Sequence, residues 1–178
     1  MEKFVIILKD EEQQNWTFNR ILFGKIILGK VKVGDKVKIY NKSEFYPKDT
    51  LIVGISIGRK LVDDACTEKE VGVHFRHNVN NVCIATNSPE LIRNKFTFET
   101  ENNEETKKLL QQDRASACFP DLYNYSFLSG LEALKELPEN KLQVTVEMIY
   151  PFYLKEESVV ILKFNNKSVN GKIVKILK

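Results

Sequence analysis

The sequence of 178 residues predicts a mainly β protein, in which a closed β-barrel is followed by a smaller β-rich domain with one or two inserted helices. Three observations support this fold class. Short runs rich in Val, Ile and Phe recur between residues 4 and 90, separated by Gly or Asn turns, which favours a barrel over an open sheet. Helix-forming residues interrupt the pattern between about 100 and 138, and β patterns then resume. Pro89 and its polar neighbours predict a boundary between domains at 1–92 and 93–178.

The first domain is expected to begin with strands at 4–8 and 21–28. In the segment KVKVGDKVKIY at 30–40, apolar residues and lysines alternate strictly, with Val31, Val33, Val37 and Ile39 in one parity. This period of two predicts an antiparallel strand pair around a turn at 34–35, with a lysine face directed outward. Further strands are expected at 51–58 and 71–77, and the polar segment 59–70 between them is expected to be a loop.

The second domain is expected to contain two helices. An Asn cap at 102–103 precedes helix-forming residues that begin at Glu104. Ser129 and Glu132 fit a capping box, leucines recur at 131, 134 and 137, and Pro138 ends this second predicted helix. Strands are predicted at 142–150, 158–164 and 168–177, the last two joined by a tight hairpin turn at 165–166, where two Asn tolerate positive φ.

The charge and cysteine content limit the class of protein. The net charge is +3, but residues 20–60 hold ten Lys or Arg against three Asp or Glu. Such a basic segment is typical either of a polyanion-binding surface, such as one for RNA, or of a solvated sheet face. Three widely spaced cysteines without a CxxC pair indicate a reduced, cytoplasmic protein, with the cysteines in the core. The longest apolar run covers only 4–8, so neither a membrane span nor a signal peptide is expected.

Several segments resemble a known family. GKIILGKVKVGDKVKIY at 24–40 looks like the second-domain barrel of translational GTPases, and GRKLVDDACTEKEVGVHFRHN at 58–78 is similar, more narrowly, to elongation factor Tu. VTVEMIYPFYL at 144–154 and FNNKSVNGKIVKIL at 164–177 resemble the closing strands of that factor's third domain. Residues 95–140 depart from the family pattern. The resemblance implies a translation-factor-type barrel followed by a truncated or modified third domain, and a role related to protein biosynthesis.

The resemblance covers only the barrel domains, so we expect no GTPase domain, no bound nucleotide and no cofactor. The segment 24–30 spells GxxxxGK, but Val31 stands where Ser or Thr would bind magnesium, and the segment lies within a β pattern. The sequence contains no NKxD or DxxG motif. His74 and His77 would face opposite sides of a continuing strand, which argues against a metal site, and Cys83 lies in an apolar run. We predict that the protein is not an enzyme.

Two binding hypotheses follow. The first is contact with RNA, either tRNA or rRNA, through a lysine-rich barrel face that would give affinity with little sequence specificity. Its candidate residues are Lys25, Lys30, Lys32, Lys36, Lys38, Arg59, Lys60, His74 and Arg76. The alternative is a protein–protein interaction module that binds a separate GTPase or a second copy of itself. A continuous basic face would favour RNA, and an exposed apolar patch would favour a protein partner.

The second domain of elongation factor Tu also helps to enclose the aminoacyl end of tRNA. The resemblance carries those positions to 10–14, Phe23 and Glu70, where only the acidic character is kept. Specific aminoacyl recognition is therefore not expected.

Overall fold

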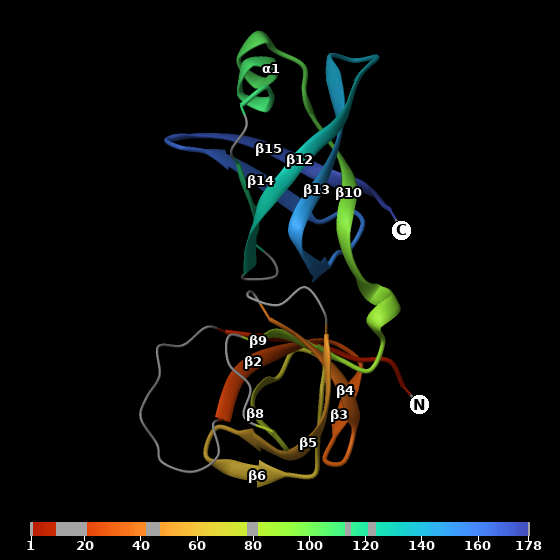
Figure 1. Cartoon of the computed structure of the whole chain (residues 1–178), viewed down its shortest axis with the longest axis vertical. Coiled ribbons are helices and arrows are strands. Elements are labelled where there is room, and N and C mark those ends of the chain that lie inside the picture. Colours follow the sequence, from red (N-terminus) through yellow and green to blue (C-terminus); the bar gives the residue numbers. More distant parts are fainter. Residues whose placement is uncertain are drawn as a thin grey trace. The chain divides into compact units, whose positions relative to one another are not determined.

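The computed structural model describes residues 2–9, 21–41, 47–77, 82–112, 115–120 and 124–177 (Figure 1). The chain divides into two compact units, Met1–Glu90 and Leu91–Lys178, close to the expected boundary. Each unit contains a closed six-stranded β-barrel, which confirms the predicted mainly β class. No helix among the described residues is long and apolar enough to cross a membrane.

The first unit contains nine strands. They are β1 (Val5–Leu8), β2 (Ile21–Leu28), β3 (Lys30–Lys32), β4 (Lys36–Asn41), β5 (Lys48–Ile57), β6 (Lys60–Val62), β7 (Asp64–Cys66), β8 (Glu70–Phe75) and β9 (Val82–Thr86). Six of them follow one another around the barrel in the order β4-β9-β1-β2-β8-β5, and pairing of β4 with β5 closes it. β6 pairs with the end of β5, and β3 pairs with β7 as a separate two-stranded sheet. The barrel interior is filled by aliphatic and aromatic side chains from all six barrel strands, including Phe4, Ile6, Ile26 and Phe75.

The alternation at 30–40 predicted side-chain directions better than strand pairing. Val31, Val37 and Ile39 are buried, as expected, whereas Val33 is exposed because it lies in the turn. The turn itself is present, with Gly34 at φ +94°. The predicted pairing across it is wrong, because β3 pairs with β7 and β4 pairs with β5 and β9. The loop expected at 59–70 is also wrong, because this segment contains the strands β6 and β7.

A short 3-10 helix at Pro89–Leu91 spans the boundary in the sequence between the two units, and the second unit follows it. Its elements are β10 (Ile92–Glu101), α1 (Glu104–Leu110), β11 (Ser116–Phe119), β12 (Asn124–Leu137), β13 (Lys141–Tyr153), β14 (Val159–Phe164) and β15 (Lys167–Ile176). The barrel order is β10-β13-β12-β11-β14-β15, and β15 closes the barrel against β10. The second unit is thus a closed six-stranded barrel.

Phenylalanine rings form the centre of the second core. Phe96 packs on Phe98 and Phe119, with ring centroids 6.1 and 5.7 Å apart, and Phe119 packs on Phe152 at 6.1 Å. All four side chains are fully buried. Aromatic rings at these separations lie within the range of favourable edge and tilted contacts.

The helix predicted over 104–117 is confirmed only for Glu104–Leu110, because β11 begins at Ser116, and the helix predicted at 129–138 is wrong. Asn103 caps α1, its Oδ1 accepting a hydrogen bond from the Thr106 backbone N–H at 2.8 Å. The second predicted helix is part of β12. Two irregularities interrupt the pairing of this strand with β13, between Leu128 and Gly130 and between Leu131 and Ala133, whereas the pairing is regular from Leu134 to Leu137.

Each such bulge adds one residue to β12, so a three-residue step returns to the same face of the strand. Leu128, Leu131 and Leu134 accordingly lie opposite Met148, Val146 and Val144, all three of which are buried. Leu128, Leu131 and Leu134 therefore share one face of the strand and mimic the periodicity of a helix, although Leu131 and Leu134 remain exposed on that face.

The hairpin turn predicted at 165–166 is confirmed. β14 and β15 pair up to Phe164 and Lys167, and Asn165 has φ +52°. Asn is one of the few side chains that adopts this left-handed conformation readily.

Candidate functional site

The nine candidate basic residues all lie on the first unit, but they do not form one lysine face. Lys25 is on β2, Lys30 and Lys32 on β3, and Lys36 and Lys38 on β4. Arg59 is in the turn between β5 and β6, Lys60 begins β6, His74 is on β8, and Arg76 directly follows β8.

Three of the lysines form ion pairs with neighbouring strands or turns. Nζ of Lys25 lies 2.6 Å from Glu68, that of Lys30 lies 2.9 Å from Asp64, and that of Lys38 lies 2.9 Å from Asp49. The pair with Asp64 raises the pKa of Lys30, first through its hydrogen bond. Because each partner carboxylate lies beside its lysine on the surface, much of the local positive charge is neutralised before any ligand arrives.

Five candidates are exposed and make no ion pair with any residue that the structure describes: Lys32, Lys36, Arg59, Lys60 and Arg76. Lys36 lies opposite Leu51 in the β4–β5 pair, and the Arg76 backbone N–H donates to the Leu51 carbonyl at 2.9 Å from the other side. Ile52, the residue after Leu51, pairs with Phe75, the residue before Arg76, and both side chains are buried in the barrel. Because successive side chains of a strand point to opposite faces, Lys36, Leu51 and Arg76 form one row on the outer face.

The other two exposed cations lie at the far end of β5. Lys60 pairs with Ile57, six residues along the strand from Leu51, a separation of about 20 Å at strand spacing. The exposed cations therefore form two groups, one around Lys36 and Arg76 and one at the β5–β6 turn.

His74 lies on β8 and its side chain is only partly exposed. Its ring packs over Gly54, where an added Cβ would lie 3.4 Å from the imidazole carbons. Its Nε2 is buried and has no hydrogen-bond partner among the described residues, and burial lowers the pKa of His74. This side chain is therefore a neutral, partly covered ring at physiological pH.

Next to His74, the outer face of the barrel carries exposed apolar side chains that the sequence analysis had not identified. Ile21 and Phe23 on β2 are 40% and 44% exposed, and Leu61 on β6 is 78% exposed. We call these three side chains the apolar strip. Leu61 could not be recognised from the sequence, because it is a single leucine among the polar residues of the segment expected to be a loop. One apolar residue there shows no periodicity.

The strip is continuous because glycine and serine lie between its members. Phe23 pairs with Gly72, Gly72 pairs with Ser56, and Ser56 pairs with Leu61, so one row crosses β2, β8, β5 and β6. A Cβ at Gly72 would lie 2.7 Å from Ile21 Cγ2 and 3.3 Å from Phe23 Cε1, which shows that both side chains lean over this glycine. The result is a shallow apolar surface with a backbone floor.

Two of the positions that the resemblance suggested for aminoacyl recognition lie in this strip or near it. Phe23 belongs to it, and Glu70 forms an ion pair with Lys9 at 2.8 Å, which lowers the pKa of Glu70. The segment 10–14 lies outside the described residues.

The described part of the chain does not assemble the other sites considered from the sequence, which are a phosphate-binding loop and a metal site. The GxxxxGK segment runs along β2, turns at Gly29 with φ +72° and continues into β3, a strand–turn–strand rather than a loop that opens a helix. No three His, Cys, Asp or Glu among the described residues are grouped to hold a metal ion. Cys83 is buried, as expected, but Cys66 is exposed and Cys118 is half-buried, so the core prediction is wrong for Cys66 and holds only in part for Cys118. No protein-family model matches the chain.

Proposed function

We propose that the protein is a non-catalytic binding module whose first barrel docks a protein partner through the apolar strip. The observation that carries this proposal is the row from Phe23 to Leu61, which exposes two large apolar side chains across four adjacent strands. Surface leucines and phenylalanines are common singly, whereas a contiguous group marks an interaction site. Phenylalanine is also enriched at the centres of protein interfaces.

The partner should present apolar side chains with acidic residues at the margin, because Arg59 and Lys60 are exposed beside Leu61. We infer a cytoplasmic partner. The resemblance to elongation factor Tu makes a separately encoded GTPase one candidate and a second copy of this chain another.

The test compares strip variants with a matched control. Phe23→Glu and Leu61→Glu place a charge in the strip, and Val159→Glu places one at a similarly exposed apolar residue on β14 of the other barrel. The immobilised full chain is used to recover partners from a lysate of the source cells, and the binding of each identified partner is then measured by calorimetry. We expect either strip variant to weaken binding about 30-fold or more, the effect of losing a central interface residue.

The controls decide the outcome. Val159→Glu should bind as the wild type does, and circular dichroism should show that the strip variants are folded. If a partner binds equally well to wild type and to both strip variants, the strip is not its docking site and the proposal fails.

A second candidate function is contact with RNA through the group around Lys36. The observation that favours it is the outer row in which Lys36 and Arg76 flank Leu51, with exposed Lys32 at the preceding turn. Lysine and arginine side chains without a carboxylate partner can neutralise phosphates at little cost.

For this candidate, affinity for a structured RNA should fall linearly with salt on a log–log plot, with a slope of about −0.7 to −0.9 for each phosphate contacted. Changing Lys32, Lys36 and Lys38 together to Glu should weaken binding and make the slope shallower. Lys163→Glu, an exposed lysine on β14, is the control. Binding that is insensitive to salt and to the triple change would rule against the RNA contact.

A further inference from the structure

In the second barrel, β12 extends beyond its short neighbour β11. β11 is only four residues long and pairs with β12 over Asn124–Phe127, whereas β12 continues to Leu137 along β13. Beyond the hydrogen bond from the Leu128 N–H to the Ala115 carbonyl at 3.0 Å, the described residues give this edge of β12 no backbone partner at 131–137. An open strand edge presents a row of N–H and C=O groups that pair best with another strand.

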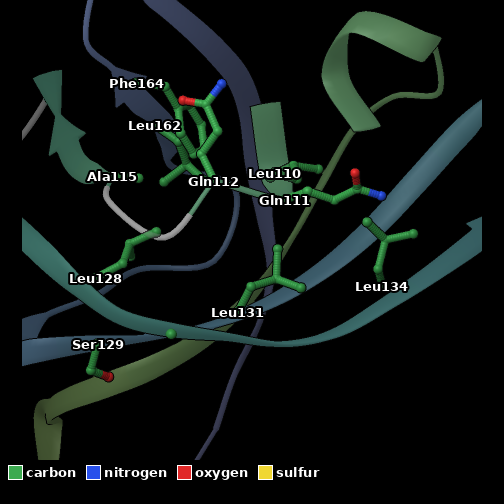
Figure 2. A pocket seen from close by; sticks show the side chains of 11 residues that line it. Leu110, Gln111, Gln112, Ala115, Leu128, Ser129, Leu131, Leu134, Leu162 and Phe164 are labelled. Carbon is green, nitrogen blue, oxygen red and sulfur yellow. The ribbon is translucent and has the colours of Figure 1, made fainter. Parts of the chain in front are cut away.

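A cavity of about 570 Å³ opens along this edge (Figure 2). Its described lining combines uncharged polar residues, Gln111, Gln112 and Ser129, and Gly130 with seven apolar residues: Leu110, Ala115, Leu128, Leu131, Leu134, Leu162 and Phe164. Leu131 and Leu134 remain 39% and 41% exposed although their strand partners Val146 and Val144 are buried. The side chains of Leu131 and Leu134 point from β12 toward the end of α1 (Figure 2). No charged side chain lines the cavity among the described residues.

The helix α1 lies at one end of the second barrel (Figure 1). Lys107 Nζ lies 2.6 Å from Glu136 on β12, and Lys167 Nζ on β15 lies 2.7 Å from Glu105. Leu109 and Leu110 of α1 are buried, so the helix is packed onto the unit and the space between α1 and β12 is present before a ligand binds. Preformed sites avoid the ordering cost that binding otherwise carries.

From the open edge and the adjoining cavity together, we propose that the second barrel binds an extended peptide segment of a partner protein as an added strand along β12 residues 131–137. Backbone hydrogen bonds to β12 supply the affinity, and apolar side chains at alternate peptide positions enter the cavity. The leucine side chains of the described lining disfavour a charge at those positions, because a buried unpaired charge is costly. This site is on the second unit and does not depend on the apolar strip.

The probe is a displayed library of random 12-residue peptides, selected on the immobilised full chain. We expect enrichment of sequences with apolar residues at every second position, and no Pro at the pairing positions. The best sequence is then made synthetically, and its affinity is measured by calorimetry. If no sequence is enriched, or if the enriched sequences lack this alternation, the proposal is overturned.

Two variants locate the peptide. Leu131→Glu and Leu134→Ser should each weaken its binding at least tenfold, whereas Ile149→Glu, at an equally exposed residue of β13, should leave it unchanged. Phe23→Glu should also leave it unchanged, which separates this site from the strip of the first barrel. Binding that is lost in Phe23→Glu and kept in Leu131→Glu would overturn the proposal and would instead support the strip.

Backbone methylation tests the strand addition itself. A peptide N-methylated at alternate residues keeps its side chains and loses its ladder donors, so we expect at least a tenfold loss for one of the two methylation registers. Amide exchange at β12 residues 131–137 should slow when the unmodified peptide binds. If neither register of methylation matters, the cavity accepts an apolar group without strand pairing, and the proposal is overturned even if Leu131→Glu weakens binding.

Discussion

Two glycines of the first barrel have positive φ for reasons that mutation can separate. Gly34 has φ +94°, and nothing lies within 4 Å of the place where its Cβ would be. Gly29 has φ +72°, and its Cβ would lie only 1.9 Å from the Lys3 carbonyl oxygen, which is closer than atoms can approach. Alanine at Gly34 therefore costs only backbone strain, about 1–2 kcal/mol, whereas alanine at Gly29 adds a steric cost of about 1–3 kcal/mol.

For a unit of this size, each kcal/mol lowers the melting temperature by roughly 4–8 °C. We expect urea denaturation, followed by amide exchange of first-barrel residues, to show a larger loss of stability for Gly29→Ala than for Gly34→Ala. Gly34→Asn should recover part of the loss, because Asn adopts left-handed conformations, and Gly29→Asn should not. Equal losses for the two alanine variants, or recovery by Asn at both positions, would refute the separation of strain from steric clash.

Three further outcomes are expected. Asn103→Ala removes the cap of α1 and should lower stability by about 1 kcal/mol, seen as faster amide exchange in the helix; unchanged exchange would contradict the cap. Because burial lowers the pKa of His74 below its ordinary value of 6.5, the neutral ring is favoured by folding, so stability should be complete above about pH 6.5 and fall as the pH drops below it. His74→Gln should reduce the difference in melting temperature between pH 7.5 and pH 5.5, and an unaltered difference would count against the buried imidazole. Calorimetry with GTP and GDP should show no saturable heat, since the GxxxxGK segment forms a strand, a turn and a strand; micromolar binding would disprove this expectation.

The sequence predicted local features of the fold better than strand partners. The turn at Gly34, the Asn103 cap and the hairpin at Asn165 each depend on a few neighbouring residues whose conformational preferences are strong. The pairing of β3 with β7 depends on segments more than 30 residues apart, and nothing in the alternation at 30–40 specifies it. The β12 leucines were misassigned because two bulges give a strand the three-residue repeat that usually indicates a helix.

The candidate site was predicted in part. Sequence parity placed Lys32 and Lys36 on the outer surface, where the structure has them. It could not show that Lys30 and Lys38 face the carboxylates of Asp64 and Asp49, because those partners come from strands whose register is set by the whole barrel. The apolar strip was missed for the same reason, since its exposed side chains come from β2 and β6, which are brought near each other only by the pairing of β8 and β5 between them.

The strand order of the first barrel has a consequence for its biosynthesis. β1 begins at Val5 but lies between β2 and β9, and Val5 is opposite Thr86. The barrel therefore cannot close until almost the whole unit has left the ribosome. Until β9 emerges, the segment of five apolar residues from Phe4 to Leu8 has one unpaired strand edge. During that interval this segment is a natural target for chaperones and a hazard for aggregation, so translation speed through the first 90 residues should influence the yield of folded protein.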